Sequence, residues 1–312
     1  MEFVNELRVA IVQTTLDNRI AWDSSASYAP RMAVTEAKRV WDEILTALTS
    51  YRNLSKSAQP EIIVLPELTI PKQYEKDIVD MAGQLGSIII GGCDFKTDDG
   101  ITVVNRGLMA VPSYWPHGEG KVQSLLFHFG KKNPAALENN YIKSIPQKSD
   151  NKKQMSFYHD DTVYIINLGC YGRLGIAICA DFYDIERYAY YKGRIQHLII
   201  LAYNKDIKSF YFLAESISRL VYCNTIICNT GHYGGSIAFS LYQKDYNRYV
   251  YKHEGKGLYT SQIVSLPVKD LWIAQCDDEH KLKTFKSMPP GYEYMYEKYE
   301  NRTPDVNSIG AL

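Results

Sequence analysis

Apolar residues along the chain fall into two alternating patterns. Short runs rich in isoleucine, valine and leucine predict buried strands, and between them apolar positions recur at helical spacing. The expected strands cover residues 8–12, 62–65, 88–90, 106–111, 173–178, 198–201, 225–228, 237–241, 249–252 and 259–266. The expected helices cover residues 34–48, 78–85, 185–191 and 213–222. This alternation predicts a layered α/β fold.

No glycine-rich linker, internal repeat or change of composition divides the chain. We therefore expect one domain over residues 1–276, followed by an extension over 277–312 that lies at the surface or at a subunit contact. The 312 residues are 46% hydrophobic and 22% charged, which is typical of a globular protein with a large core.

The charge balance and the apolar runs exclude several kinds of partner. Lys and Arg number 35 and Asp and Glu number 35, so the basic excess expected of a nucleic-acid or anionic-membrane binder is missing. The apolar runs are too short to cross a bilayer, and the first residues lack the pattern of a secretion signal, so we expect a cytoplasmic protein. The expected partner is a small molecule or another protein.

Six cysteines and scattered histidines form no metal-binding or disulfide pattern in the sequence. No cysteine pair has the C-x-x-C spacing, and no histidine stands at zinc-finger distance. We therefore expect no metal and no cofactor, and most of the thiols to be ordinary core residues.

Three residue types that support acyl chemistry follow core segments of the chain. Glu67 follows the strand 62–65, the pair Lys131 and Lys132 comes next, and Cys179 follows the strand 173–178. Hydrolysis of a carbon-nitrogen bond through a covalent intermediate needs a nucleophile, a proton shuttle and positive charge where an oxyanion develops. A thiol, a carboxylate and an ammonium group can fill these three roles.

The motifs around these residues resemble those of the nitrilase, or carbon-nitrogen hydrolase, superfamily. A glycine-containing strand leads into Cys179 with Asp181 two residues later, Glu67 stands in a Val-Leu-Pro-Glu-Leu segment, and residues 134–138 read Pro-Ala-Ala-Leu-Glu. Residues 224–236, with an Asn and a Gly-Gly-Ser turn, are similar to a late strand of the family. The resemblance implies a four-layer αββα sandwich of the nitrilase type.

The resemblance also implies roles for individual residues. Cys179 corresponds to the nucleophile and Glu67 to the general base, and the backbone N–H of Ala180 helps to bind the oxyanion. The family's lysine lies three residues before the proline, which selects Lys131, with Lys132 as the alternative. Glu138 is similar to a second glutamate that orients this lysine.

The expected activity is that of a cysteine-dependent amidase, because Ala180-Asp181 follows the nucleophile and true nitrilases usually carry Trp-Glu there. The substrate would be an amide or carbamoyl compound, hydrolysed through a thioester-type intermediate with no cofactor. Nitrile hydrolysis, acyl transfer, or a binding and assembly role beside a partner protein stay open, since the Arg-Phe-Pro usually found after the cysteine motif is replaced here. Candidate substrate contacts are Ala180, Phe182, Tyr183, Tyr203 and Asn204.

The aromatic segment after Cys179 predicts self-association. The family pairs subunits through helices beside the nucleophile strand, and tyrosines suit such contacts. We expect at least a homodimer, with Tyr188 or Tyr191 at the contact.

Overall fold

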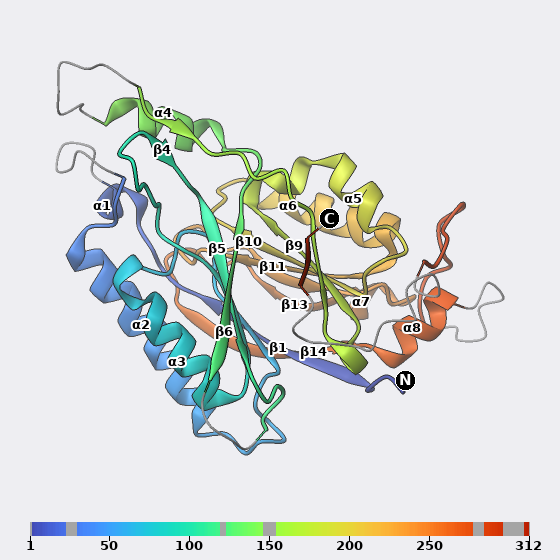
Figure 1. Ribbon diagram of the computed structural model, residues 1–312. Helices are drawn as coiled ribbons and strands as arrows, with labels where there is room; N and C mark the ends of the chain where they lie inside the picture. The colour runs from blue at the N-terminus through green and yellow to red at the C-terminus, as the bar shows by residue number, and fades with distance from the viewer. Residues whose placement is uncertain are drawn as a thin grey trace.

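Two β-sheets pack face to face in the computed structural model, and helices cover the outer face of each sheet (Figure 1). The structure describes residues 2–22, 30–118, 123–145, 154–276, 284–295 and 309–311. One apolar cluster fills the space between the sheets, and a second lies between the first sheet and its helices. The layers run α, β, β, α, so the expected four-layer sandwich is confirmed.

The first sheet has the strand order β14-β1-β2-β3-β5-β6. Its strands are β1 (Glu6–Gln13), β2 (Ile62–Val64), β3 (Ile88–Gly92), β5 (Arg106–Pro112), β6 (Ser124–Gly130) and β14 (Thr260–Pro267). Strands β1, β2 and β3 are parallel, whereas β14, β5 and β6 join their neighbours antiparallel. The central strands are buried on both faces, which explains their continuous isoleucine and valine runs.

The second sheet has the strand order β13-β12-β11-β10-β9-β8-β15. Its strands are β8 (Tyr164–Asn167), β9 (Arg173–Ile178), β10 (His197–Ala202), β11 (Asn224–Asn229), β12 (Ser236–Phe239), β13 (Tyr249–His253) and β15 (Ile309–Ala311). A separate pair joins β4 (Thr102–Val103) and β7 (Ser156–Phe157). Strands β9, β10 and β11 are parallel, so the loops that follow them meet at one end of the sheet.

The helices lie on both outer faces of the sandwich (Figure 1). They are α1 (Asn18–Ala21), α2 (Val34–Arg52), α3 (Glu75–Leu85), α4 (Ala136–Ser144), α5 (Ile185–Tyr191), α6 (Ile207–Ile217), α7 (Asp245–Arg248) and α8 (Lys269–Cys276). Short 3-10 turns are η1 (Lys72–Tyr74), η2 (Gly169–Tyr171) and η3 (Cys179–Tyr183), and η4 (Ser218–Tyr222) is a π-helical turn. Helices α2 and α3 belong to the outer core of the first sheet, and α5 and α6 cover the second.

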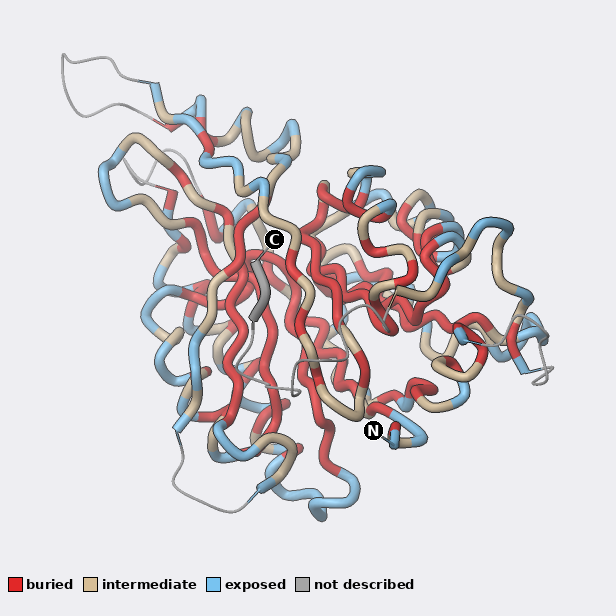
Figure 2. Tube along the Cα trace, turned by 45° about the vertical axis from the view of Figure 1, so that its right-hand side comes forward, coloured by how far each residue is buried: buried red, intermediate tan, exposed pale blue. Residues whose placement is uncertain are grey.

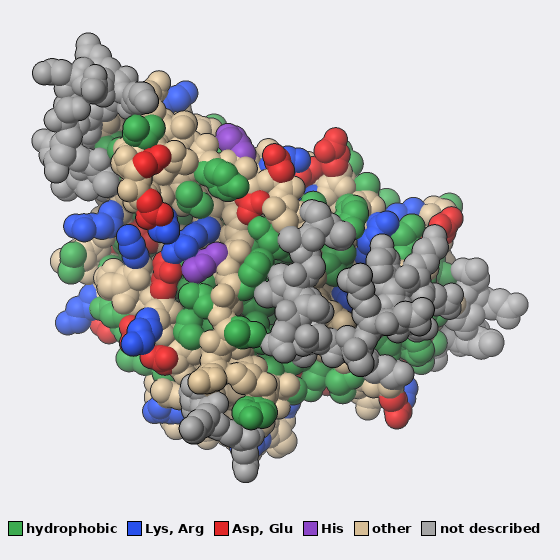
Figure 3. Space-filling model, in the orientation of Figure 1, with side chains coloured by type: hydrophobic (Ala, Val, Ile, Leu, Met, Phe, Trp, Pro, Cys, Tyr) green, Lys and Arg blue, Asp and Glu red, His purple; other side chains and the backbone are tan. Residues whose placement is uncertain are grey.

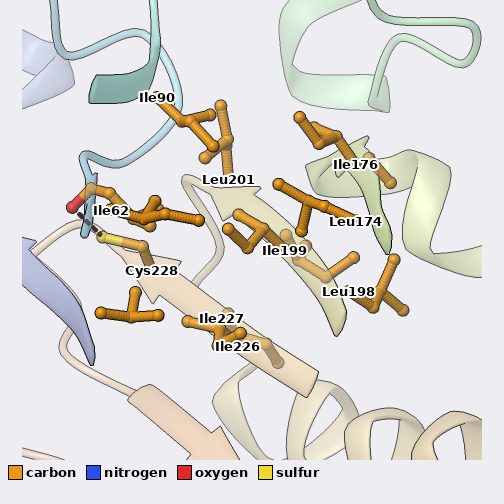
Figure 4. Packing of buried hydrophobic residues seen from close by; sticks show 14 of the residues in the cluster. Ile62, Ile90, Leu174, Ile176, Leu198, Ile199, Leu201, Ile226, Ile227 and Cys228 are labelled. Carbon is orange, nitrogen blue, oxygen red and sulfur yellow. Dashed lines mark hydrogen bonds between the residues drawn. The ribbon is translucent and has the colours of Figure 1, made fainter. Parts of the chain in front are cut away.

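The contact between the sheets is apolar. Ile62 and Ile90 of the first sheet face Leu201 and Ile199 of the second (Figure 4), and Cys228 lies among them. The thiol of Cys228 donates to the carbonyl oxygen of Val64 at 3.3 Å, a bond between the two sheets. Buried residues follow both sheets along their length (Figure 2). The sheets are therefore held in a fixed relation, which positions the loops at their ends.

Most expected elements are present, and the differences have local causes. The helix expected over 213–222 begins earlier, at Ile207, because the side chain of Asp206 caps it by accepting the N–H of Ser209, and it becomes π-helical from Ser218. Strand β6 was not expected, since it is an edge strand whose Leu125 is exposed, which blurs the alternation.

Helix α5 corrects the expectation about its tyrosines. Tyr188 and Tyr191 are buried within the chain, and the hydroxyl of Tyr188 donates to the carbonyl oxygen of Asp181 at 3.2 Å. They cannot form a subunit contact. The exposed large apolar residue of this helix is instead Ile185.

Part of the segment 277–312 lies against the domain. Phe285 is buried in a small cluster with Leu271 of α8, and β15 pairs antiparallel with β8. Within the residues that the structure describes, none of the helices combines the length and the apolar character that crossing a bilayer requires.

Candidate active site

Cys179 stands at a sharp turn where β9 ends and η3 begins. Its φ angle is 43°, in the left-handed region that residues other than glycine rarely adopt. A strained turn of this kind lifts a side chain out of the end of a sheet, as in the nucleophile elbow of the α/β-hydrolase fold. The thiol therefore points away from the strand and toward the neighbouring loops.

Glu67 lies in the turn after β2, which is held tightly against β3. The N–H of Gly92 donates to the carbonyl oxygen of Pro66 at 2.9 Å, and the N–H of Ile70 donates to that of Gly92 at 2.8 Å. A Cβ atom on Gly92 would lie 2.4 Å from the Cα of Glu67, closer than real Cβ contacts allow. Glycine at position 92 therefore permits the approach that sets the position of Glu67.

Lys131 directly follows β6 and joins two carboxylates. Its Nζ donates to Glu67 Oε1 at 2.8 Å and to the Oε2 of Glu138, in the first turn of α4. Lys131 and Glu67 are each 2% exposed. The ammonium group of Lys132 lies elsewhere, 3.3 Å from Asp184 Oδ2. Of the two lysines, the structure thus brings Lys131 into the carboxylate cluster.

Asn105 completes this cluster, and the sequence analysis did not select it. Its Nδ2 donates to Glu67 Oε1 at 2.9 Å and to Glu138 Oε1 at 2.6 Å, so one amide bridges both carboxylates. The backbone carbonyl oxygen of Asn105 accepts the backbone N–H of Lys131 at 3.0 Å. The only sequence signal is a polar residue directly before the buried strand β5, which is too common to indicate a site.

Burial sets the protonation of these groups. Burial raises the pKa of Glu67, and the ammonium of Lys131 opposes that rise. Burial also raises the pKa of the Cys179 thiol well above its usual range, Glu67 adds to the rise, and Lys131 opposes it. The pKa of Lys131 is raised because the attraction of Glu67 and Glu138 outweighs its burial. The resting site therefore holds a neutral thiol, a permanently charged ammonium and a carboxylate with increased proton affinity.

Asp181 ties the loop of the thiol to the loop of the lysine. Its carboxylate accepts the N–H of Lys132 at 3.0 Å, and the N–H of Asn133 at 2.8 Å. Asp181 follows β9 in the second sheet, whereas these two residues follow β6 in the first. A single buried side chain thus links the two halves of the site across the sandwich.

Comparison with solved structures identifies the fold. A carbon-nitrogen hydrolase superfamily protein of Xanthomonas campestris, with an arsenic adduct in its active site, is similar at a TM-score of 0.58 and 12% identity, over 92% of this chain and 100% of that one. An amidase of Nesterenkonia sp. is similar at a TM-score of 0.56 and 12% identity, over 86% of this chain and 93% of that one. The chain has the carbon-nitrogen hydrolase fold.

A variant of the Nesterenkonia amidase, with the acetamide moiety of fluoroacetamide added to its active-site cysteine, is similar at a TM-score of 0.58 and 11% identity, over 86% of this chain and 94% of that one. No protein-family model and no curated protein matches this sequence. Because the identities are low, it is the carbon-nitrogen hydrolase fold that these comparisons establish.

On this carbon-nitrogen hydrolase fold, the residues expected to contact a substrate differ in exposure. Ala180 is partly exposed and Tyr183 is 54% exposed, and both belong to η3, the turn that begins at Cys179. Phe182 is fully buried and packs edge-on against Phe210 at 5.3 Å between ring centroids, so it supports the loop from the core.

The other two expected contacts follow β10. The hydroxyl of Tyr203 donates to the carbonyl oxygen of Leu16 at 3.0 Å, and its backbone N–H is among the groups that lower the pKa of Cys179. Asn204 accepts the N–H of Asp206 through its side chain at 2.9 Å and so closes its own turn. Tyr203 thus reaches the thiol through its backbone, while its ring anchors the N-terminal loop.

Proposed function

We propose that this protein is a cysteine-dependent hydrolase of a non-peptide carbon-nitrogen bond, in an amide or a carbamoyl compound. The observation that carries the proposal is the buried group of Glu67, Lys131 and Glu138 beside a thiol on a strained strand end. A structural cysteine has no need of a strained backbone or of an adjacent buried acid and ammonium group.

In the first half of the reaction, Cys179 forms a thioester. Glu67 accepts the Sγ proton while the sulfur attacks the carbonyl carbon, and the carbonyl oxygen becomes an oxyanion. Lys131 Nζ and the N–H of Ala180 are the donors that stabilise it. Glu67 then gives the proton to the leaving nitrogen, the carbon-nitrogen bond breaks, and ammonia or an amine departs.

In the second half, water replaces the amine. Glu67 accepts a proton from the water as its oxygen attacks the thioester carbon, and the donors again hold the oxyanion. The carbon-sulfur bond breaks, the sulfur takes the proton back from Glu67, and the carboxylic acid leaves. The net reaction consumes one water molecule and restores every group of the site.

Glu138 and Asn105 are positioning residues in this scheme. Both carboxylates keep Lys131 charged, so it donates hydrogen bonds and does not act as a base. The amide of Asn105 fixes the separation of Glu67 and Glu138 by bonding to one oxygen of each. The proton shuttle therefore falls to Glu67, whose pKa burial raises.

The test is a panel of short aliphatic amides, carbamoyl compounds, ω-amides and nitriles, with ammonia and acid measured together. We expect ammonia release from at least one amide or carbamoyl compound, and none from Cys179→Ala protein of unchanged thermal stability. Fluoroacetamide should alkylate Cys179 first, with a carbon-sulfur bond formed and fluoride released. A nitrile-only product pattern would assign nitrile hydrolysis, and inert Cys179 with no turnover would favour a binding role.

We also propose that the protein self-associates through the outer face of α5 and α6. Ile185 is 80% exposed and Phe212 is 71% exposed, and the exposed ring of Tyr183 packs beside Phe210. Large apolar side chains exposed on these helices favour a contact with a second copy. Sedimentation should show at least a dimer, and Ile185→Asp with Phe212→Asp should dissociate it.

A further inference from the structure

Three side chains that can bind metals converge on the outer face of the first sheet. Glu75 is the first residue of α3, Cys93 directly follows β3, and His128 lies in β6. Their ligand atoms all lie within 4.8 Å of one another. The positions are far apart in sequence, which is why no spacing motif indicates them. On the face shown in Figure 3, basic, acidic and histidine side chains stand close together over this part of the molecule.

The local geometry suits a shared ion. His128 Nε2 lies 3.4 Å from Glu75 Oε2. Nitrogen and oxygen ligands of a tetrahedral zinc ion, each at about 2.1 Å from the metal, are roughly 3.4 Å apart. The same Nε2 atom is buried and, within the described residues, makes no aligned hydrogen bond. The imidazole and the carboxylate thus lie side by side at a spacing that one ion can bridge.

The elements that carry these ligands are firmly fixed. Strand β5 lies between β3 and β6, with His128 opposite Leu108, and the N–H of Cys93 donates to the carbonyl oxygen of Arg106 at 2.8 Å. Cys93 is fully buried, whereas the side chain of His128 is 33% exposed. An ion would therefore enter from the histidine side and meet the thiol at the bottom of the site.

We propose that Glu75, Cys93 and His128 bind one divalent transition-metal ion of the zinc class. A thiolate, an imidazole and a carboxylate are ligands that zinc accepts together, whereas magnesium and calcium require oxygen ligands alone. Three protein ligands leave a fourth position open to water or to a small ligand. This site is separate from the thiol of Cys179, and its metal binding is measured without turnover, so it stands independently of the proposed hydrolase.

Arg106 competes with the metal for Glu75. Its Nη2 lies 2.8 Å from both carboxylate oxygens of Glu75. The metal must share this carboxylate or displace the guanidinium group, so Arg106 lowers the affinity. Replacing it with a neutral residue should tighten binding, an effect that general damage to the fold would not produce.

The test uses the full-length protein with Cys179→Ser, so that the thiol of the candidate active site cannot contribute. Cobalt added to metal-free protein should produce a sulfur-to-cobalt absorption band and a tetrahedral visible spectrum at one equivalent. Zinc should abolish both signals and magnesium should not. Zinc affinity is then measured by competition with a chromogenic chelator.

The variants decide the outcome. Adding Cys93→Ser should remove the sulfur-to-cobalt band, and adding His128→Gln should weaken zinc binding by at least the roughly 10- to 100-fold that loss of a supporting partner costs. Arg106→Gln should tighten zinc binding by about 5- to 10-fold, the effect of removing one nearby like charge. The matched controls Cys223→Ser and His253→Gln should change neither quantity. The absence of a cobalt-thiolate band, or its survival in the Cys93→Ser protein, would overturn the proposal.

Discussion

Replacing Gly92 with alanine should displace Glu67 from Lys131. The added methyl would lie 2.4 Å from the Cα of Glu67 and 2.4 Å from the N of Leu68, and both of these are backbone atoms. Bringing the first contact to the ordinary distance of 3.4 Å needs a shift of 3.4 − 2.4 = 1.0 Å. A misplacement of about 1 Å can cost about 100-fold in rate, and overpacking costs about 1–3 kcal/mol in stability.

The neighbouring glycine supplies a matched control. A methyl on Gly91 would lie 2.7 Å from Cδ1 of Ile70 and 2.8 Å from Cβ of Leu65, so it meets side chains and leaves the Glu67 backbone in place. We expect Gly91→Ala to lower the free energy of unfolding by a similar amount. It should retain far more activity than Gly92→Ala.

Three measurements separate the two variants. Urea unfolding gives the free energy of unfolding, amide hydrolysis gives kcat, and fluoroacetamide gives the alkylation rate of Cys179. Gly92→Ala should lose about 100-fold in kcat and in alkylation rate at a temperature where it is fully folded. Equal kcat values for the two variants would refute the argument that Gly92 sets the position of Glu67.

Three further predictions follow from the contacts of individual side chains. Asn105→Asp should lower kcat by about 100-fold and shift its pH profile, because a third carboxylate would face Glu67 and Glu138, whereas a purely structural residue would leave the profile unchanged. Lys131→Ala should be inactive and Lys132→Ala only impaired, because Lys132 pairs with Asp184; kcat of both variants decides this. Burial lowers the pKa of His197 to about 4. The neutral imidazole therefore contributes stability that is present above about pH 6.5 and is lost as the pH falls toward 4, about 3 kcal/mol in all. His197→Gln should flatten the pH dependence of the free energy of unfolding measured in urea. Burial raises the pKa of Asp94 to about 6, so this residue makes the free energy of unfolding change with pH in the opposite direction over nearly the same pH range. The contribution of His197 is therefore read from the difference between the His197→Gln variant and the wild type.

The strands and the elbow could be predicted because their causes are local. Continuous apolar runs identify strands buried on both faces, and Cys179 follows such a run directly. Strand β6 was not predicted because one face of this edge strand is partly exposed, which weakens the alternation of apolar and polar residues. The tyrosines of α5 were misplaced because aromatic content alone does not tell which face of a short helix is covered.

The convergence of side chains could not be predicted from the pattern. Asn105 reaches Glu67 and Glu138 only because β5 lies between β3 and β6, and this strand order is a property of the assembled sheet. The contact of Asp181 with the loop after Lys131 requires both sheets to be docked. Such contacts depend on packing between segments that are distant in sequence.

The pairing of β1 with β14 sets when the first sheet can be completed during synthesis of the chain. Strands β8 to β13 of the second sheet come from one continuous stretch, 164–253, whereas the first sheet joins Gln13 to Thr260. Contacts at such separation form slowly, and a nascent chain presents its N-terminal part first. Strand β1 therefore cannot pair with β14 until residues 260–267 have left the ribosome. Reactivity of Cys179 would report the docking of the two sheets in a refolding or translation experiment, since Glu67 and Lys131 follow strands of the first sheet and the thiol follows a strand of the second.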